Sequence, residues 1–391
     1  MTIVQLTFKD YKSKLKPIWC PGCGDFGVVS SIYKALAAIG RPPHEIAFIS
    51  GIGCSSRIPG YTTAYGFNTV HGRALPIAQG IKLANPELLV LAAGGDGDGF
   101  SIGGGHVPHA IRRNPDITYI VMDNQIYGLT KGQLSPTSAC GTKTVTSAYG
   151  SLEEPVNPLL YVLSYGAGFV AQATPADLPG MTQVIEEAIR YPGFSFVNIQ
   201  SPCVTYGAEH QQVKAHRAWM TPLASLDHDA TDRMKAIQLA SKYGEELHTG
   251  VFYKNPSPPK TYGELIAERQ EALADGSTRP RSSTATPEGA ADDHQGTGHR
   301  LRHADAEGRA RPRGPRREEA MDRYGELADQ LELHRTGARR ASSGSWRATR
   351  PSTARRSSSS ARPSSATSRA ASRARCSSTS RRPTTTRRAS S

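Results

Sequence analysis

The chain has 391 residues and six cysteines, and its formal net charge of +13 is concentrated at one end. Residues 276–391 hold 25 Arg, no Lys and 11 Asp or Glu, a net charge of +14, so residues 1–275 carry about −1. The basic composition is therefore no sign of nucleic-acid binding by the folded part, and no apolar run approaches the roughly 18 residues of a membrane span. Without an apolar signal segment at the start, the cysteines favour metal ligation over disulfides, and we expect a cytoplasmic protein.

Between about residues 20 and 215, short apolar runs alternate with amphipathic stretches. The runs predict strands at Glu45–Ile52, Leu88–Ala93, Ile117–Met122, Gly168–Ala173 and Phe194–Ile199. The amphipathic stretches predict helices at Val28–Ala38, Ala74–Leu83, Gly105–Arg112 and Ala176–Arg190. Several runs are apolar almost throughout, as strands buried on both faces should be. We therefore predict an α/β fold, a doubly wound parallel sheet with helices on both faces and ligands at the carboxyl ends of its strands.

The character of the chain changes after residue 220. We predict a helical extension over residues 221–275. It has a helix at Thr231–Leu247, followed by a Pro-rich connector with the sequence NPSPPKTYGE. Residues 276–391 form an Arg/Ser-rich, low-complexity segment with too few apolar residues to offset chain entropy, so we expect a disordered tail. Only Glu318–His334 keeps a weak helical pattern. The tail is either a solvated basic segment for acidic partners or the product of out-of-frame translation, which an Arg-rich segment without Lys resembles.

Four cysteines lie where they can reach one centre. Cys20 and Cys23 form WCPGCG, Cys54 follows the first predicted strand in SGIGCSS, and Cys203 follows the last in QSPCVTYG. A C-x-x-C pair brings two sulfurs to one point, and cysteines at strand ends can join it. Four thiolates suit a [4Fe–4S] cluster or a structural zinc. A zinc ribbon would need a second C-x-x-C pair, which favours the cluster; the remaining two cysteines, in a polar loop and in the tail, receive no ligand role.

A glycine-rich segment, GGDGDG at residues 94–99, directly follows the apolar run LLVLAA. Asn124 ends the next predicted strand, so Asp96 and Asn124 should lie at one edge of the sheet. A carboxylate, an amide oxygen and a backbone carbonyl near Ile126 are the hard ligands that Mg²⁺ combines with phosphate oxygens. The glycines let the backbone approach a diphosphate closely. The segment is not a Walker loop, because no G-K-[ST] follows, nor a Rossmann fingerprint, because no G-x-G-x-x-G opens the first strand–helix turn.

Together these motifs resemble the β subunit of 2-oxoacid:ferredoxin oxidoreductases, most closely the 2-oxoglutarate synthase type. The resemblance covers roughly residues 17–215 through PIWCPGCGDFG, SGIGCSSRIPGY, HGRALPIAQGIKLANP, GGDGDGFSIGGGH, DNQIYGLTKGQLSPT and SPCVTYG. It implies a thiamin-diphosphate-binding and iron–sulfur-binding catalytic domain over residues 1–220. It also implies one [4Fe–4S] cluster on Cys20, Cys23, Cys54 and Cys203, and Mg²⁺ on Asp96, Asn124 and the Ile126 carbonyl. The residues it places against the cofactor are Ile52, Gly53, Cys54, Ser55, His71, Gly72, Gly97, Asp98 and Leu129.

The resemblance also suggests two basic residues for the substrate. Arg57 stands where the family often has Lys, near the substrate carboxylate, and Lys131, in GLTKGQ, is a candidate for contact with substrate or ferredoxin. Simpler interpretations stay open: Arg57 could pair with a surface carboxylate, Lys131 could be a solvated loop residue, and His71 could be an ordinary core or capping histidine.

The implied reaction is the oxidative decarboxylation of 2-oxoglutarate with CoA to succinyl-CoA and CO₂, with reduction of ferredoxin. Pyruvate or another 2-oxoacid is an alternative substrate, and a non-redox thiamin lyase or synthase that uses Asp96 and Asn124 but not the cysteines is an alternative enzyme. Only the diphosphate half of a thiamin site is recognisable, so we expect an α-type partner in a heterodimer or a dimer of heterodimers. We expect no nucleic-acid or membrane partner.

Overall fold

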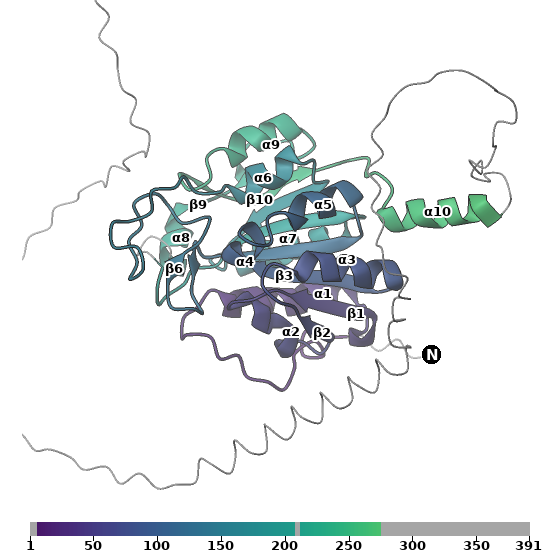
Figure 1. The fold of residues 1–391 in the computed structure, drawn as a ribbon, viewed down its shortest axis with the longest axis horizontal. Helices are drawn as coiled ribbons and strands as arrows, with labels where there is room; N and C mark the ends of the chain where they lie inside the picture. Colours follow the sequence, from purple (N-terminus) through teal and green to yellow (C-terminus); the bar gives the residue numbers. More distant parts are fainter. Residues whose placement is uncertain (1–5, 208–211, 275–391) are drawn as a thin grey trace, which may run out of the picture. The chain divides into compact units, whose positions relative to one another are not determined.

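The computed structural model describes residues 6–207 and 212–274 (Figure 1). Its centre is an eight-stranded sheet with the strand order β2-β1-β3-β4-β8-β7-β10-β9. The strands are β1 (Ile46–Ser50), β2 (Tyr65–Asn68), β3 (Leu89–Gly95), β4 (Ile117–Asp123), β7 (Phe169–Ala173), β8 (Phe194–Gln200), β9 (Met220–Pro222) and β10 (Leu247–Lys254). Neighbours from β2 to β7 pair in parallel, and β10 pairs antiparallel to β7. The five predicted strands are confirmed, each with ends within two residues of the prediction.

Helices lie in the connections between these strands, before β1 and after β10. The longer ones are α1 (Asp25–Ile39), α3 (Ala74–Ala84), α5 (His106–Arg113), α6 (Pro158–Ser164), α7 (Leu178–Arg190), α8 (Val213–Trp219), α9 (Arg233–Ala240) and α10 (Tyr262–Ala274); the short α2 (Ile58–Tyr61) and α4 (Asp96–Phe100) follow β1 and β3. The four helices predicted before residue 220 are confirmed as α1, α3, α5 and α7. The predicted α/β class, with helices on both faces of a mostly parallel sheet, is therefore confirmed.

Two hydrophobic cores, one on each face of the sheet, explain why the central strands are mostly apolar. Every residue of β1, β4, β7 and β8 is buried. In β1, Phe48 packs in the core with α1 and α7, whereas Ile49 packs in the core with α3 and α5. Alternate side chains thus fill opposite cores, and each fully buried large apolar side chain contributes about 1.5–3 kcal/mol.

The prediction for Thr231–Leu247 is wrong in its second half. Helix α9 ends at Ala240, and Leu247 begins β10, which joins the sheet beside β7. A turn at Gly244, with a φ of 84°, separates the two elements. The extension therefore contributes strands β9 and β10 as well as helices, while the domain boundary at residue 220 stays a prediction.

The Pro-rich connector ends earlier than expected, because α10 begins at Tyr262. Thr261 accepts a hydrogen bond from the Glu264 N–H, and the Glu264 carboxylate accepts one from the Thr261 N–H. This reciprocal pair is a capping box, whose T-x-x-E pattern is present in the sequence. The tail beyond residue 274, with its weak pattern at Glu318–His334, lies outside the described residues. Within the described ranges, no helix combines the length and apolar character needed to cross a bilayer.

Candidate functional site

A cavity opens at the carboxyl ends of β1, β3 and β4. Its space is about 410 Å³, part of it open to solvent. Residues from the sequence motifs line it: Ile52, Gly53, Cys54, Ser55, Asp96, Gly97, Asp98, Asn124, Ile126 and Leu129. Asp25, Met122, Tyr127, Gly128 and Thr130 also contribute to the wall. The predicted position of the site, at the carboxyl edge of the sheet, is where this cavity lies.

Asp96 follows β3 directly and is 2% exposed. Its Oδ2 accepts hydrogen bonds from Ser135 Oγ at 2.5 Å and Thr137 Oγ1 at 2.7 Å. Among the residues that the structure describes, the one donor to its Oδ1 is the Asn124 N–H, at the long distance of 3.4 Å. Burial raises the pKa of Asp96 to about 7, and the neighbouring Asp123 carboxyl acts in the same direction. Among the described residues, no Lys, Arg or His forms an ion pair with Asp96, so a divalent cation fits the charge of this site.

Asn124 and Ile126 flank the same cavity on the segment after β4. Asn124 Oδ1 accepts a hydrogen bond from the Ile126 N–H at 3.1 Å. Gln125, between them, has a φ of 59°, in the left-handed region that non-glycine residues seldom adopt. The turn leads into a small hairpin, β5 (Ile126–Tyr127) with β6 (Gln133–Leu134), which returns the chain so that Ser135 and Thr137 reach Asp96. The hairpin therefore links the Asn124–Ile126 segment to Asp96 through the hydroxyls of Ser135 and Thr137.

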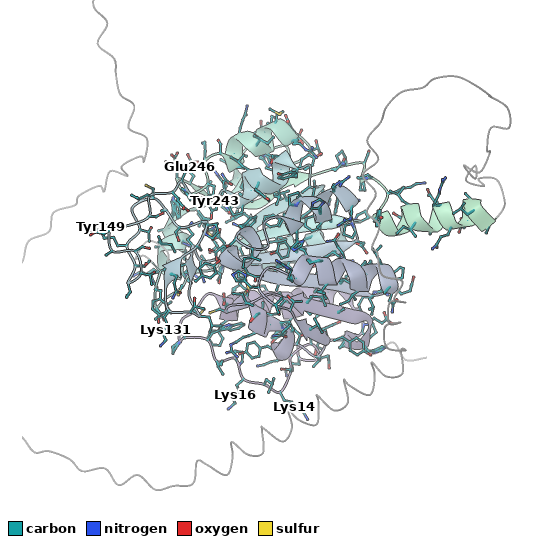
Figure 2. The ribbon with its side chains drawn as sticks, in the orientation of Figure 1. Lys14, Lys16, Lys131, Tyr149, Tyr243 and Glu246 are labelled. Carbon is teal, nitrogen blue, oxygen red and sulfur yellow. The ribbon has the colours of Figure 1, made fainter. Side chains whose placement is uncertain are left out.

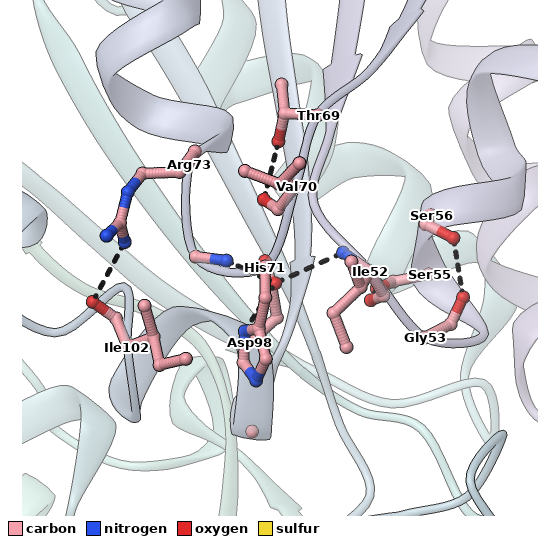
Figure 3. A network of polar contacts seen from close by, with 12 residues as sticks. Ile52, Gly53, Ser55, Ser56, Thr69, Val70, His71, Arg73, Asp98 and Ile102 are labelled. Carbon is pink, nitrogen blue, oxygen red and sulfur yellow. Dashed lines mark hydrogen bonds and ion pairs between the residues drawn. The ribbon is translucent and has the colours of Figure 1, made fainter.

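Asp98 holds three loops together at the other side of the cavity. Its Oδ1 accepts hydrogen bonds from the Ile52 N–H at 3.1 Å and the Gly72 N–H at 2.7 Å, and lies 3.2 Å from His71 Nδ1 (Figure 3). Burial raises the pKa of Asp98, against the opposing effect of these N–H groups. Gly72 has a φ of 71°, and a Cβ there would stand 2.4 Å from the Gly103 nitrogen, so only glycine fits. His71 and Gly72 thus bind Asp98 and do not line the cavity.

Tyr127 closes the cavity above Gly97. Its hydroxyl donates to the Gly97 carbonyl at 2.8 Å and lies 3.5 Å from His71 Nε2. A Cβ on Gly97 would stand 2.5 Å from the Tyr127 ring. The absence of a side chain at Gly97 therefore allows the aromatic ring to pack on the backbone of the glycine-rich segment.

The four cysteines gather at the same edge. The Cys23 N–H donates to the Cys20 carbonyl at 3.0 Å, and the next residue's N–H, of Gly24, donates to the Pro202 carbonyl at 3.2 Å. This second bond joins the C-x-x-C turn to the segment that carries Cys203.

Gly128 marks where the two predicted ligand sets meet. The point at which a Cβ on Gly128 would stand is 3.4 Å from Cys203 Sγ, 3.9 Å from Cys54 Sγ and 3.8 Å from Asn124 Nδ2. Two of the sulfurs and a predicted cation ligand therefore face one small space.

The pKa shifts of Cys23 and Cys54 also reflect the proximity of the cysteines to one another. Burial is the main cause that raises the pKa of Cys54 to about 12, and Asp25, Cys203 and Cys20 act in the same direction. Burial, Asp25, Cys54 and Cys203 likewise raise the pKa of Cys23. The thiols would therefore give up their protons on binding metal. In the part of the chain that the structure describes, no three His, Cys, Asp or Glu side chains are already arranged as a metal site, so the four-cysteine ligand set stays a prediction.

Known proteins share both the sequence and the fold. The model of the thiamine pyrophosphate enzyme C-terminal TPP-binding domain matches residues 51–199, and a model of the C-terminal part of the pyruvate ferredoxin oxidoreductase β subunit matches residues 203–271. The 2-oxoacid:ferredoxin oxidoreductase β subunit of Saccharolobus solfataricus is 39% identical over 269 residues, which cover 66% of this chain and 88% of that protein. The chain belongs to the 2-oxoacid:ferredoxin oxidoreductase β-subunit family.

Two further relatives of this oxidoreductase chain have more specific names. The 2-oxoglutarate synthase subunit KorB of Methanothermobacter marburgensis is 38% identical over 262 residues, or 66% of this chain and 90% of that protein. The structure of a 2-oxoglutarate:ferredoxin oxidoreductase from Magnetococcus marinus, with 2-oxoglutarate, coenzyme A and succinyl-CoA bound, matches with a TM-score of 0.66 and 45% identity over 70% of this chain and 92% of the other. The resemblance stated from the sequence is thereby confirmed.

The two basic candidates of this oxidoreductase chain lie off the cavity wall. Arg57 is half-buried and contributes a small lowering to the pKa of Cys54. Lys131 is exposed, as Figure 2 shows, and has a φ of 80°. Leu129 and Thr130, just before it, do line the cavity, and Leu129 is 49% exposed. The roles of Arg57 and Lys131 stay predictions.

Sequence reasoning missed several residues of the site. Ser135 and Thr137 donate hydrogen bonds to Asp96, which lies 39 and 41 residues earlier in the sequence. Asp123 lies 3.3 Å from the Thr137 hydroxyl. Asp25, two residues after Cys23, is 2% exposed and accepts a hydrogen bond from Ser201 Oγ at 2.5 Å. The only available signal was a run of hydroxyl residues, SPTS, after the GLTKGQ loop.

Proposed function

We propose that this chain is the β subunit of a 2-oxoglutarate:ferredoxin oxidoreductase that binds thiamin diphosphate, Mg²⁺ and one [4Fe–4S] cluster. The main support for this proposal is the space beside Gly128. The sulfurs of Cys203 and Cys54 and the Asn124 side chain all lie within 4 Å of the position that a Gly128 Cβ would take. A non-redox thiamin lyase or synthase would have no use for sulfurs beside its cation ligands. This proximity therefore favours an enzyme that passes electrons from its thiamin site to a cluster.

In this proposal, Asp96, Asn124 and the Ile126 carbonyl hold Mg²⁺. The hydroxyls of Ser135 and Thr137 occupy Asp96 Oδ2 and leave Oδ1, with one long hydrogen bond, for the cation. The glycine-rich segment around Gly97, on which Tyr127 packs, would face the diphosphate. Leu129, beside the cavity, offers an apolar surface to the organic part of the cofactor. Asp98 orients the Ile52–Ser55 loop, whose residues would contact the cofactor.

Cys20, Cys23, Cys54 and Cys203 would hold the cluster. The thiols of Cys23 and Cys54 keep their protons in the protein without metal, because burial and the Asp25 carboxyl raise the pKa of both groups. Iron would displace the protons, as metals do at thiol sites. When bound, thiamin diphosphate supplies an electron sink at the keto carbon of the substrate and the cluster accepts electrons singly.

The substrate proposal depends on the named relatives. The KorB protein and the Magnetococcus structure are both named for 2-oxoglutarate, so we assign 2-oxoglutarate with CoA as substrates and succinyl-CoA and CO₂ as products. Pyruvate is the second candidate, because the model that matches residues 203–271 describes a pyruvate enzyme. Arg57 and Lys131 are the candidates for contact with a substrate carboxylate.

Partners follow from the same proposal. The relatives are β subunits, which supports an α-type partner that completes the pyrimidine side of the thiamin site, in a heterodimer or a dimer of heterodimers. Ferredoxin is the proposed acceptor, since low cluster potentials suit it. We place the enzyme in the cytoplasm, where thiols stay reduced.

The test is the cofactor content of the enzyme, co-expressed with its α-type partner and purified without oxygen. We expect iron and sulfide in equal amounts, together with Mg²⁺ and thiamin diphosphate, and CoA-dependent reduction of a one-electron dye that is fastest with 2-oxoglutarate. Thiamin diphosphate without iron would instead indicate the lyase or synthase. Faster reduction with pyruvate would retain the enzyme class and overturn the substrate assignment.

A further inference from the structure

A second buried carboxyl group, that of Asp123, lies next to the proposed cation ligand Asp96, with the Thr137 hydroxyl between them. Asp123 ends β4, one residue before Asn124, and is 1% exposed. Among the residues that the structure describes, no Lys, Arg or His forms an ion pair with it. Its oxygens are instead satisfied by hydrogen-bond donors, as a buried carboxyl group requires.

Two of these donors lie on β8, the strand next to β4, and a third comes from the segment between α9 and β10. Asp123 Oδ2 accepts hydrogen bonds from Gln200 Nε2 at 2.8 Å, from Asn198 Nδ2 at 3.1 Å and from the Tyr243 hydroxyl. Tyr243 lies between α9 and β10 (Figure 2), within residues 203–271, which match the pyruvate ferredoxin oxidoreductase model. Its hydroxyl also accepts a bond from Gln200 Nε2 at 3.3 Å. The segment between α9 and β10 thus contributes a donor to the carboxyl edge of the sheet, at the end of β4.

Thr137 connects Asp123 to Asp96. Its hydroxyl lies 2.7 Å from Asp96 Oδ2 and 3.3 Å from Asp123 Oδ1. A hydroxyl group has one proton, so Thr137 can donate to only one of the two carboxyl groups at a time. The shorter distance favours Asp96 as the acceptor. Asp123 Oδ1 then keeps another donor, the Gln125 N–H at 3.3 Å, and the donors to Oδ2, of which the Tyr243 hydroxyl is one, satisfy the rest of this carboxyl group.

We propose that Tyr243 is a positioning residue for the cation ligand Asp96. By donating to Asp123, it leaves the Thr137 hydroxyl free to donate to Asp96, which fixes Oδ2 and presents Oδ1 to the cation. Without the Tyr243 hydroxyl, Asp123 competes for the Thr137 proton and Asp96 loses a donor. Hydrogen-bond partners of metal ligands typically change metal affinity by about 10–100-fold when they are removed. This inference rests on the proposed function, which places Mg²⁺ at Asp96.

The test is the affinity for thiamin diphosphate at low and at saturating Mg²⁺. The Tyr243→Phe enzyme, purified with its α-type partner and stripped of cofactor by chelation, is titrated with thiamin diphosphate while tryptophan fluorescence is recorded. We expect binding about 10-fold weaker than in the wild type at low Mg²⁺ and near wild-type binding at saturating Mg²⁺. A general packing defect would not be repaired by Mg²⁺, so equal weakening at both concentrations, or no weakening, would overturn the proposal.

A matched control removes another buried phenol hydrogen bond. Tyr11 is fully buried, and its hydroxyl donates to the Arg41 carbonyl at 2.8 Å. The Tyr11→Phe enzyme should bind thiamin diphosphate like the wild type at both Mg²⁺ concentrations. Weakening at low Mg²⁺ that is as large as in Tyr243→Phe would refute a specific role of Tyr243.

A double-mutant cycle tests the route through Thr137. If Tyr243 acts through this hydroxyl, then Tyr243→Phe should weaken binding no further in a Thr137→Val background. Additive penalties would overturn the route. If Thr137→Val does not fold, the Mg²⁺ dependence of the single variant still decides the proposal. A wild-type enzyme without Mg²⁺-dependent binding would overturn the proposed function, and the inference with it, whereas normal wild-type binding with an unaffected Tyr243→Phe enzyme would overturn the inference alone.

Discussion

Replacement of Asp96 by Asn separates the two roles of this carboxyl group, as a cation ligand and as a buried acid. The side chain keeps its size and one oxygen, but it cannot carry a negative charge. In the cofactor-free protein, burial and Asp123 raise the pKa of Asp96 to about 7 from its ordinary value of 3.8. Asp96→Asn therefore removes an acid whose ionisation opposes folding, and it also removes the charge that would bind Mg²⁺.

The sign of the effect follows from the direction of the shift. Because the folded-state pKa lies above the unfolded one, the folded protein holds this proton more tightly, and the resulting stability is complete below about pH 4 and lost as the pH rises through about 7. A shift of this size corresponds to about 4 kcal/mol, which we take as an upper limit because the nearby hydroxyls can reorient. Asp96→Asn should therefore leave stability near that of the wild type at pH 4 and raise it at pH 8, by about 2–4 kcal/mol or roughly 4–16 °C in Tm.

Thermal unfolding of the cofactor-free proteins between pH 4 and 8 measures this effect. Mg²⁺ with thiamin diphosphate should reverse the order at pH 8, since a ligand at 100 times its Kd adds about 2.7 kcal/mol to the wild type and little to Asp96→Asn. An unchanged Tm difference across the pH range would refute the electrostatic reasoning. Equal stabilisation of both proteins by the cofactor would refute the role of Asp96 as a ligand.

Three further substitutions test separate parts of the site. Cys203→Ser should lower the iron content and slow electron transfer while thiamin diphosphate stays bound, because Cys203 lies outside the predicted Mg²⁺ ligands; loss of both cofactors would contradict this separation. Gly97→Ala should weaken thiamin diphosphate binding by about 10-fold or more in a calorimetric titration, because its Cβ would stand 2.5 Å from the Tyr127 ring. The double variant Gly97→Ala, Tyr127→Leu should recover part of this loss of affinity. Phe196 is fully buried in β8, so Phe196→Ala should lower the free energy of unfolding by about 3–5 kcal/mol in a denaturant titration. The folded fraction should keep its iron content. An iron-free folded protein would show that this core supports the cluster directly.

The central strands were predictable because their burial leaves a direct mark on composition. Strands β1, β4, β7 and β8 are buried on both faces, and their sequences are apolar almost throughout. Strand β10 escaped prediction because it follows helix α9 after a short turn and its pairing partner, β7, lies far earlier in the chain. No local pattern reports a pairing over that distance.

The proximity of site residues was predictable only where they stand at the ends of neighbouring strands. Asp96 and Asn124 stand at the ends of successive strands, so topology alone brings them to one edge. Ser135 and Thr137 reach Asp96 only because the hairpin of β5 and β6 turns the chain back over the cavity. That hairpin has two residues in each strand, too few to leave a periodic signal.

Strand order alone does not bring the sulfurs together. Strands β1 and β8 are three positions apart in the sheet, so their ends lie about 14 Å from each other at the usual spacing of about 4.8 Å. Hydrogen bonds bend the following loops inward: the Ile52 N–H donates to Asp98, and the Ser201 N–H donates to the Asp123 carbonyl at 2.8 Å. Cys54 and Cys203 thereby face the space beside Gly128. The Asp98 carboxylate, after β3, and the Asp123 backbone carbonyl, at the end of β4, therefore hold in place the loops that carry Cys54 and Cys203, so replacement of the Asp98 carboxylate should move Cys54 relative to the cavity.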